Sequence, residues 1–446
     1  MTPEIKHRIG QIRRGEMPEG YNRVRDSIIP SDWKQYCLGE LGKNKNGLNF
    51  HREDKGIKIR ILGVGDFGNL SVLRDLNALS EISMRFMPDD ELLLKNGDIV
   101  FVRSNGSKEL VGRNLLVYPQ NEKVSFSGFC IRFRLSSDKI TTAEYINLLL
   151  DNGVLKQKLQ SENQGSNISN LNQSIIDNLQ ISIPCKGEQQ KIVAILTTQD
   201  RVIELKEKRL AEKQRQKKYL MQQLLTGKKR LPGFSGEWKN IKLCEVLSER
   251  KEKNVEQNLR ICSVAVQKGV VDQVEHLGRS YAANDTSNYS VAHYGDIIYT
   301  KSPTGDFLYG IVKQNLLQET VAVSPLYGVF TPLTFGLGYF LHTYFQSAIC
   351  ARNYLLPIVQ KGAKNTINIT NDTFISSKLY LPLDVEEQKA IADTFIAADR
   401  EIELLQQDIE QEKQKKKALM QLLLTGIVRV KTWRKKKYRN ISAKNC

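Results

Sequence analysis

The sequence repeats itself at a distance of about 200 residues. LMQQLLTGKKR at 220–230 returns as LMQLLLTGIVR at 419–429. Upstream, IPCKGEQQKIVAIL at 183–196 returns as LPLDVEEQKAIADTF at 381–395 with a one-residue insertion. A period of this length is too long for a solenoid, whose repeats run about 20 to 50 residues. The chain is therefore a duplication of a whole module, which predicts an internal pseudo-twofold repeat.

Each half also carries a tryptophan motif and a Gly-Asp-Ile strand signal. SDWK at 31–34 corresponds to GEWK at 236–239, and GDIVFVRS at 97–104 corresponds to GDIIYTKS at 295–302. The N-terminal segment at 1–30 completes the repeat in a circular sense. Its arginines, glycines and proline precede a tryptophan, as they do after the first repeated helix end.

Two segments have the apolar periodicity of a long helix. Apolar residues recur at alternating intervals of three and four from Leu196 to Leu224 and from Phe395 to Leu423. We call each series an apolar seam; polar residues interrupt both seams in the middle. Gly227 and Gly426 follow the seams, and glycine tolerates the left-handed conformation beyond a helix end. A helix over 188–226 would be roughly 58 Å long. We expect the two helices to form an antiparallel coiled coil with each other; a coil between separate chains is the alternative.

The regions between the helices are rich in strand signals, with shorter helices predicted at 143–159 and 337–355. We predict an α/β (α+β) fold in which two globular domains are separated by the pair of long antiparallel coiled-coil helices. The strand signals are at 58–65, 98–104, 129–135, 296–302 and 327–332. The predicted divisions are an N-terminal segment at 1–30, a globular domain at 31–184, a helix at 185–230, a second globular domain at 231–382, a second helix at 383–429 and a basic tail at 430–446.

The net charge points to a polyanionic partner. The formal charge is +17 and the pI is near 9.4, which attracts nucleic acid or, as the weaker alternative, an anionic membrane surface. No apolar run is long enough to span a bilayer, and the N-terminus lacks a signal peptide, so we expect a cytoplasmic protein. The seven cysteines form no C-x-x-C pair, which favours reduced thiols over zinc binding or disulfides.

Catalytic motifs are weak in this sequence. Residues 63–68 spell G-x-G-x-x-G, but no βαβ pattern follows, so a glycine-rich turn is favoured over a dinucleotide site. There is no P-loop, no histidine stands at metal-ligand spacing, and no Asn-Pro-Pro-Tyr or Asp-Pro-Pro-Tyr string is present. Asp98 and Asp296 are expected to shape the turns before their strands rather than to act as acids or bases. We predict no catalytic, cofactor-binding or metal-binding residue.

Basic and amide side chains follow both Gly-Asp-Ile strands. Arginine reads guanine and asparagine reads adenine in the major groove, whereas serine, threonine and lysine commonly contact phosphates. A second, weaker pair of loops includes Ser166 and Asn167 in the first half. For any single residue, a solvated basic loop is the alternative. The predicted DNA-binding residues are Arg103, Ser104, Asn105, Lys108, Arg113, Lys301, Ser302, Thr304, Lys361, Lys364 and Asn365.

In combination, these features resemble the DNA-specificity (S) subunits of Type I restriction-modification systems. The resemblance is carried by the E-x-Q-K variants at 188–191 and 386–389, by both LM-x-x-LLTG-like helix ends, by residues 97–113 and by PGFSGEW at 232–238. It implies two target-recognition domains, each reading one half of a bipartite, asymmetric DNA site, with the helices setting the spacer. Because the loops after the two Gly-Asp-Ile strands differ, we expect two different half-sites.

The resemblance also implies the partners. The subunit itself has no catalytic residues; it binds double-stranded DNA and recruits two methyltransferase (M) subunits, which carry S-adenosylmethionine, and through the complex the restriction (R) subunits, which use ATP and Mg. The assembled complex would be an adenine-N6 DNA methyltransferase and ATP-dependent endonuclease.

Two alternatives follow from the residues themselves: a self-contained DNA-modifying or DNA-cleaving enzyme with an unrecognised active site, and a coiled-coil scaffold. The basic tail at 430–446 is compatible with an extra DNA contact, a partner-docking tail or a frayed terminus.

Overall fold

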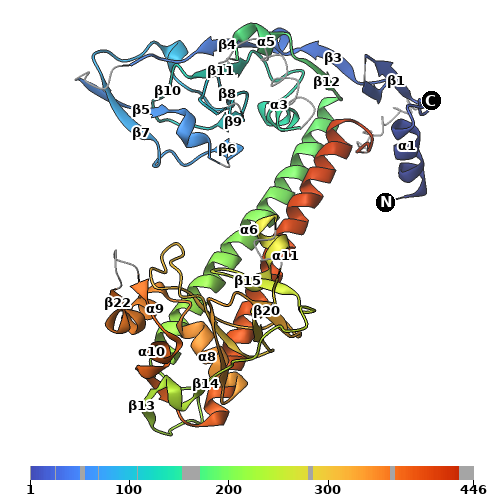
Figure 1. Cartoon of the computed structure of the whole chain (residues 1–446). Coiled ribbons are helices and arrows are strands. Elements are labelled where there is room, and N and C mark those ends of the chain that lie inside the picture. The colour runs from blue at the N-terminus through green and yellow to red at the C-terminus, as the bar shows by residue number, and fades with distance from the viewer. Residues whose placement is uncertain are drawn as a thin grey trace, which may run out of the picture. The chain divides into compact units, whose positions relative to one another are not determined.

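The contacts within the chain divide it into two units, and each unit contains part of both long helices. The first unit is Met1–Leu205 together with Glu410–Cys446, and the second is Lys206–Ile409. Each unit mixes strands and helices, which confirms the predicted α/β class (Figure 1). This computed structural model describes residues 2–25, 27–50, 56–68, 70–107, 109–152, 171–279, 285–361 and 367–430.

The first unit is built on a five-stranded sheet with the order β4-β11-β8-β9-β6, next to a three-stranded sheet β10-β5-β7. Two antiparallel pairs, β1–β2 and β12–β3, complete it. The strands are β1 (Tyr21–Val24), β2 (Ser27–Pro30), β3 (Lys34–Cys37), β4 (Gly42–Asn46), β5 (Ile57–Leu62), β6 (Val72–Leu73), β7 (Ser80–Met84), β8 (Asp98–Val102), β9 (Asn114–Val117), β10 (Val124–Phe126), β11 (Cys130–Leu135) and β12 (Gln180–Ile183). The helices are α1 (Pro3–Arg13), α2 (Leu38–Leu41), α3 (Ala143–Leu150) and α5 (Gln173–Asp177), with 3-10 turns η1 (Val64–Phe67) and η2 (Asp90–Leu92).

The second unit contains two four-stranded sheets, β14-β21-β18-β19 and β16-β15-β20-β17. The strands are β13 (Trp238–Lys242), β14 (Leu247–Glu249), β15 (Ile261–Ala265), β16 (Gly269–Asp272), β17 (Ser290–Ala292), β18 (Ile297–Tyr299), β19 (Val312–Gln314), β20 (Val321–Val323), β21 (Gly328–Pro332), β22 (Gln360–Lys361), β23 (Ile367–Asn368) and β24 (Lys378–Pro382). The helices are α7 (Gln273–Leu277), α8 (Phe335–Tyr344), α9 (Ala348–Leu355) and α10 (Asn371–Ser376), with 3-10 turns η3 (Leu243–Glu245) and η4 (Leu356–Ile358).

The two units share one sheet framework. The order β4-β11-β8-β9 in the first unit corresponds to β14-β21-β18-β19 in the second, and all of these neighbours are antiparallel. The registers also agree, since Ile99 is opposite Phe133 and Ile297 is opposite Phe330. The duplication seen in the sequence is therefore a duplication of strand order and register.

The Gly-Asp-Ile strands run through the middle of each core. In β8, Ile99 packs in the cluster that contains α3, whereas Val100 packs toward the strands of the second sheet. In β18, Ile297 and Ile298 divide in the same way between the α8 side and the second sheet. Alternate residues of a strand point to opposite faces, so both strands are covered on both sides. This burial holds the loop that follows each strand at a fixed place.

The two long helices are α6 (Lys186–Leu224) and α11 (Val385–Leu424). Gly227 and Gly426 follow them with φ of 68° and 74°, which confirms the predicted left-handed helix ends. Within each unit, a stretch of α6 lies beside a stretch of α11 (Figure 1). Among the residues that the structure describes, no helix is long and apolar enough to cross a bilayer.

The polar interruptions of the apolar seams are positions of ion pairing between the helices. In the first unit, Gln199 donates to Glu412 (2.6 Å) and Lys416 pairs with Asp200. In the second unit, the pairs are Lys206–Asp408 (2.7 Å), Lys213–Glu401 (2.8 Å) and Lys217–Asp399. Residue numbers rise along one helix as they fall along its partner, so the two helices run in opposite directions.

One predicted helix is wrong in its extent. The apolar pattern at 337–355 predicts a single helix, but the structure has α8 and α9 with a break between them. Ser347 stands at the break, and its side chain accepts a hydrogen bond from the backbone N–H of Cys350. A serine that caps a new helix favours a break over continuation.

The predicted turn at 63–68 is confirmed. Residues Val64–Phe67 form the 3-10 turn η1, and the Asp66 carboxylate accepts a hydrogen bond from the backbone N–H of Gly63 (2.7 Å). The Asp66 side chain therefore binds the backbone at the start of the turn.

Candidate nucleic-acid interface

The aspartates of the two Gly-Asp-Ile motifs are buried and fully occupied by contacts within the protein. Asp98 is 1% exposed; it accepts two hydrogen bonds from Arg134 (2.7 and 2.8 Å) and one from the backbone N–H of Lys95. Hydrogen bonds between a guanidinium and a carboxylate are strong, and the hydrogen bond to Asp98 raises the pKa of the Arg134 guanidinium. The predicted role in shaping the turn before the strand is confirmed.

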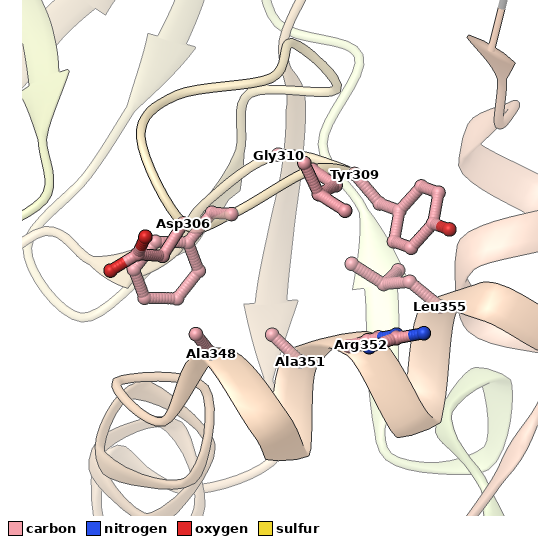
Figure 2. Close-up of a pocket in the computed structure, with 9 residues that line it drawn as sticks. Asp306, Tyr309, Gly310, Ala348, Ala351, Arg352 and Leu355 are labelled. Carbon is pink, nitrogen blue, oxygen red and sulfur yellow. The ribbon is translucent and has the colours of Figure 1, made fainter.

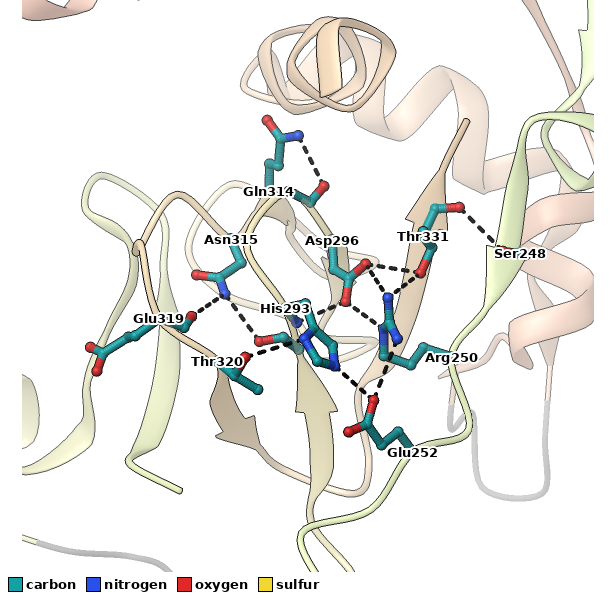
Figure 3. A network of polar contacts seen from close by, with 12 residues as sticks. Ser248, Arg250, Glu252, His293, Asp296, Gln314, Asn315, Glu319, Thr320 and Thr331 are labelled. Atoms are coloured by element: carbon teal, nitrogen blue, oxygen red, sulfur yellow. Dashed lines mark hydrogen bonds and ion pairs between the residues drawn. The ribbon is translucent and has the colours of Figure 1, made fainter. Parts of the chain in front are cut away.

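The carboxylate of Asp296 is also buried and also accepts several hydrogen bonds, but from different residues. Arg250 donates to its carboxylate (2.6 Å), as do the Thr331 hydroxyl (2.9 Å) and the backbone N–H of His293 (2.8 Å) (Figure 3). In register, Thr331 occupies the place of Arg134 in the first unit. Figure 3 also shows Glu252 bridging His293 and Arg250. Each motif is thus fixed at its start, which positions the loop at the other end of its strand.

In the first unit, the predicted DNA-binding loop follows β8. The backbone N–H groups of Arg103 and Ser104 both donate to the Phe129 carbonyl (2.8 and 3.4 Å). Asn105 accepts from the backbone N–H of Ser107 (2.8 Å), so its carbonyl oxygen folds the loop. The backbone of Arg113 pairs with that of Val102. The structure therefore brings Arg103 and Arg113 to the same strand end.

In the second unit, the corresponding loop follows β18. Lys301 has a left-handed backbone (φ 59°) and is half-buried, and burial lowers the pKa of its ammonium group. Ser302 and Thr304 are exposed. The backbones of Thr304 and Phe307 exchange two hydrogen bonds of 3.0 Å, which closes the loop into a tight turn. Both hydroxyls are therefore accessible in the loop that follows β18.

Arg352 is a basic residue near this loop that the sequence analysis missed. It is exposed on α9, which lines a shallow hollow together with residues 306–310 (Figure 2). About 50 residues separate Arg352 from the loop in the sequence, so only the pairing of α9 with the loop reveals their proximity. Arg352 adds a positive charge beside the predicted site.

The remaining predicted residues include one in a strand of the second unit. Lys361 lies in β22, which pairs with β23. Lys108, Lys364 and Asn365 lie outside the described residues, as do Ser166 and Asn167.

A second set of polar groups, each centred on a buried glutamate, lies where the end of one long helix meets the start of the other. In the first unit, the Arg429 guanidinium donates to Glu188 (2.7 and 2.8 Å) and to Asp32 (2.8 Å), and it lies over the Trp33 ring. These contacts raise the pKa of Arg429 and lower that of Asp32. We call this group of residues the first junction.

The second junction repeats the arrangement. Arg230 donates two hydrogen bonds to Glu387 and lies over the Trp238 ring. The Trp238 indole N–H also donates to Glu387 (3.1 Å). Glu188 and Glu387 are both 1% exposed. The two repeated motifs of the sequence are therefore partners: the glutamate that starts each helix binds the arginine that follows the end of the other.

Within the described ranges, no group of three or more His, Cys, Asp or Glu side chains is placed to hold a metal ion. The geometry offers two strand-end loops with basic and hydroxyl side chains, each on a sheet with the same framework. Such loops are suited to contacts with phosphates and base edges.

Comparison with known proteins finds one family and full-length relatives. The sequence profile described as "Type I restriction modification DNA specificity domain" matches residues 30–214 and 237–414. The chain is similar to the Type I restriction enzyme MjaVIII specificity subunit of Methanocaldococcus jannaschii, with 23% identity over 93% of this chain and 97% of that protein. The putative MjaX specificity subunit of the same organism is 23% identical over 93% and 98%. The crystal structure of a Type I restriction-modification S subunit from M. genitalium aligns with a TM-score of 0.54 and 10% identity, over 92% of this chain and 97% of that chain.

Proposed function

The chain belongs to the family of Type I restriction-modification DNA specificity domains, and we propose that it is the non-catalytic, sequence-specific DNA-binding subunit of a Type I restriction-modification complex. We assign target-recognition domains to 31–184 and 231–382, each of which reads one half of a bipartite, asymmetric site. The observation that supports this most directly is the shared sheet framework with unlike loops. A common framework presents both loops at equivalent strand ends, whereas Arg103-Ser104-Asn105 and Lys301-Ser302-Pro303 offer different hydrogen-bonding groups.

We assign the DNA contacts to the predicted residues and divide them by chemistry. Arg103, Asn105 and Arg113 carry groups that read base edges, whereas the exposed hydroxyls of Ser302 and Thr304 suit phosphate oxygens. Ser104, Lys108, Lys301, Lys361, Lys364 and Asn365 complete the proposed contact set. The net charge of +17 supplies attraction to the phosphate backbone and a steep salt dependence of binding.

The helices at 185–230 and 383–429 are proposed to act as an antiparallel coiled coil that sets the spacer between the half-sites. The cross-helix ion pairs and the two junctions support this role, because they fix the register of one helix against the other. The segment at 1–30 closes the repeat: Tyr21 donates to the carbonyl of Gly426 (2.7 Å) at the end of α11.

The proposed partners are double-stranded DNA and two methyltransferase subunits, with restriction subunits joining through the complex. S-adenosylmethionine would then belong to the methyltransferase subunits, and ATP and Mg to the restriction subunits. A role for the tail at 430–446 in DNA or partner binding remains a prediction.

Methylome sequencing tests the proposal directly. Cells that express this chain with its methyltransferase subunits should show adenine methylation at one bipartite motif, and deletion of this chain alone should abolish methylation at that motif. Purified chain without methyltransferase subunits should transfer no methyl group. Methylation or cleavage of DNA by the isolated chain would instead favour a self-contained enzyme.

A further inference from the structure

Each unit carries a short turn that presents a large apolar side chain to solvent next to the predicted DNA-binding loop. In the first unit the turn is Ser127–Cys130, and Phe129 at its tip is 63% exposed. In the second unit the turn is Ser324–Tyr327, and Leu326 at its tip is 72% exposed. Single exposed apolar residues are common in soluble proteins, so exposure alone carries no argument here.

The argument comes from the equivalence of the two turns. The strand pairing places Phe101 opposite Ile131 and Tyr299 opposite Gly328, and counting back two residues makes Phe129 and Leu326 equivalent. The sequences VSFSGFCIRF at 124–133 and VAVSPLYGVF at 321–330 align without a gap. Both turns lead from a strand of the second sheet, β10 or β20, into a strand of the shared framework, β11 or β21.

The same hydrogen bonds hold both turns. The Ser127 hydroxyl accepts from the backbone N–H of Phe129 (3.3 Å), and the Ser324 hydroxyl accepts from the backbone N–H of Leu326 (3.3 Å). The turns close with backbone bonds from Cys130 to Ser127 (2.8 Å) and from Tyr327 to Ser324 (3.0 Å). Turn tips usually carry glycine, asparagine, aspartate or serine. A serine-anchored turn with an apolar tip, present twice at one position, calls for a functional reason.

The first turn is also held rigidly against its surroundings. The backbone N–H of Gly128 donates to the Leu48 carbonyl (2.6 Å), and a Cβ added at Gly47 would lie 2.1 Å from the Ser127 carbonyl oxygen. The Phe129 carbonyl in turn accepts from the backbone of Arg103 (2.8 Å). The apolar tip and the predicted base-reading arginine are therefore parts of one fixed unit.

We propose that Phe129 and Leu326 are specificity-determining residues, one in each half-site, whose side chains make apolar contacts with base edges in the DNA groove. The C5-methyl of thymine is the apolar group that the major groove presents. The inference rests on the proposed function, since it needs both units to read DNA. Because phenylalanine and leucine differ in size and shape, the same turn would favour different base pairs in the two half-sites.

Selection from a randomised DNA library, with the complex of this chain and its methyltransferase subunits, tests the proposal. The variants are Phe129→Ala and Leu326→Ala. Phe129→Ala should lower the preference for the bound base by about fivefold or more at one or two positions of one half-site, the usual cost of a poor base contact. Leu326→Ala should do the same in the other half-site only.

Three measurements separate an apolar base contact from other effects. Phe86→Ala removes another exposed phenylalanine of the first unit (81% exposed), which follows β7 beside the opposite end of β5, and should leave both half-sites unchanged. Neither tip residue is charged, so the dependence of binding on salt should stay as in the unsubstituted protein. At the positions that lose preference, replacing thymidine by deoxyuridine in the DNA should weaken binding by the unsubstituted protein. The same replacement should leave binding by Phe129→Ala unchanged.

The outcomes are distinguishable. If the unsubstituted complex enriches a bipartite site and both alanine variants keep every base preference, the inference is wrong while the proposed function stands. If the unsubstituted complex enriches no sequence, the proposed function itself fails. Uniform weakening at all positions would assign the tips to protein stability or to non-specific contact, and would also overturn the inference.

Discussion

At the residue scale, the two aspartates of the Gly-Asp-Ile motifs show how one requirement is met twice with different side chains. Asp98 takes its guanidinium from Arg134 on β11, whereas Asp296 takes it from Arg250 after β14, with Thr331 on β21. Breaking a buried pair of this kind typically costs about 3–5 kcal/mol, because the remaining charge is left unpaired. The aspartate is thus essential to the framework, while the position of the arginine is free to differ.

Arg103→Ala should change recognition in one half-site only. A bidentate arginine–guanine contact contributes about 1–3 kcal/mol of discrimination, so the expected loss is about 5- to 150-fold for the preferred base against its competitors. Binding measured on DNA variants at each position of the site checks this. Lys301→Ala is the matched comparison in the second unit: lysine suits a phosphate contact, so this variant should weaken binding to all DNA variants about equally. Equal weakening on all sequences would show that Arg103 contacts phosphate instead.

Lys313 predicts a dependence of stability on pH. It is 3% exposed, and burial, with a smaller effect from Lys217, lowers the pKa of its ammonium group from 10.5 to about 8, while Asp399 acts in the opposite sense. His342, which faces the same charges, has its pKa lowered as well. Because Lys313 releases its proton more easily in the folded chain, its charge destabilises the fold below about pH 8. This cost disappears as the pH rises toward 10.5.

Lys313→Met should therefore stabilise the second unit by about 2–3 kcal/mol at pH 7. The advantage over the unsubstituted protein should shrink between pH 8 and pH 10, where the lysine of the folded chain is already neutral. Denaturant unfolding of both proteins at pH 7 and pH 9.5 measures the difference. A constant advantage at both pH values would mean that methionine improves packing and that the buried charge has no cost.

At the element scale, the junctions explain why the chain repeats both the glutamate at a helix start and the arginine after a helix end. Arg230 follows the end of α6 and binds Glu387 at the start of α11, and Arg429 follows the end of α11 and binds Glu188 at the start of α6. A buried glutamate destabilises the fold unless it is paired, so loss of the arginine after the end of one helix should destabilise the start of the other helix. Each helix end is thereby fixed to the other helix start in its own unit.

Arg230→Ala should loosen the start of α11. The loss leaves the carboxylate of Glu387 buried without its guanidinium partner, while the Trp238 indole N–H still donates to it, at a cost of about 3 kcal/mol. Hydrogen exchange of the backbone amides in the first turns of α11 should accelerate by about 100-fold. Arg215→Ala removes an exposed i,i+3 pair on α6, with 76% of the arginine side chain accessible, and should have little effect. No acceleration in Arg230→Ala would show that the junction contributes nothing to helix pairing.

The sequence predicted the elements that depend on local patterns. The ends of the long helices at Gly227 and Gly426 and the Gly-Asp-Ile strands follow from patterns within a few residues, and the duplication follows from the recurrence of such patterns along the chain. The break between α8 and α9 was missed, because the apolar residues continue through it and a single serine cap decides. Arg429 and Glu188 pair although they are 241 positions apart in the sequence, and no local pattern predicts such a contact.

The candidate site divides in the same way. Basic and hydroxyl residues after β8 and β18 were predictable, since they follow recognisable strands. Phe129, Leu326 and Arg352 were not, because their significance depends on which turn or helix is packed beside each loop. The cross-strand register that makes Phe129 and Leu326 equivalent is a property of the folded sheets.

At the scale of the whole molecule, excess positive charge and the long helices have separate roles. The chain has 66 Lys and Arg against 49 Asp and Glu. Several charges of the long helices are paired across the helix pair, Lys206, Lys213 and Lys217 among them. Charges that are paired in this way neutralise each other. The excess of Lys and Arg over Asp and Glu therefore lies mostly outside the helix pair, in the globular domains and in the tail at 430–446, and the role proposed for the helices is to set the spacer.

The proposed spacer role predicts how the length of the two helices affects the rotational position of one half-site relative to the other around the DNA. Seven residues inserted after Leu205 in α6 together with seven after Ile409 in α11 add two turns to both helices at facing positions, and the apolar seam is preserved. The added length is about 10 Å, or about three base pairs, which carries the second half-site roughly a third of a turn around the duplex. Such a variant should bind poorly at every spacer length, since stiff helices cannot bring both domains to the same face of the DNA.

Insertions of 21 residues in both helices should restore recognition. The added length, roughly 32 Å, approaches the 34–36 Å of one DNA turn, so the same half-sites should be bound with a spacer longer by about nine or ten base pairs. Insertion into α6 alone is the control and should abolish binding, because it shifts the cross-helix pairs out of register. Methylome sequencing of cells that carry each variant gives the spacer directly. Equal activity of the 7-residue variant at a spacer three base pairs longer would mean that the domains turn freely on the helices, and the helix pair would then measure distance without fixing rotation.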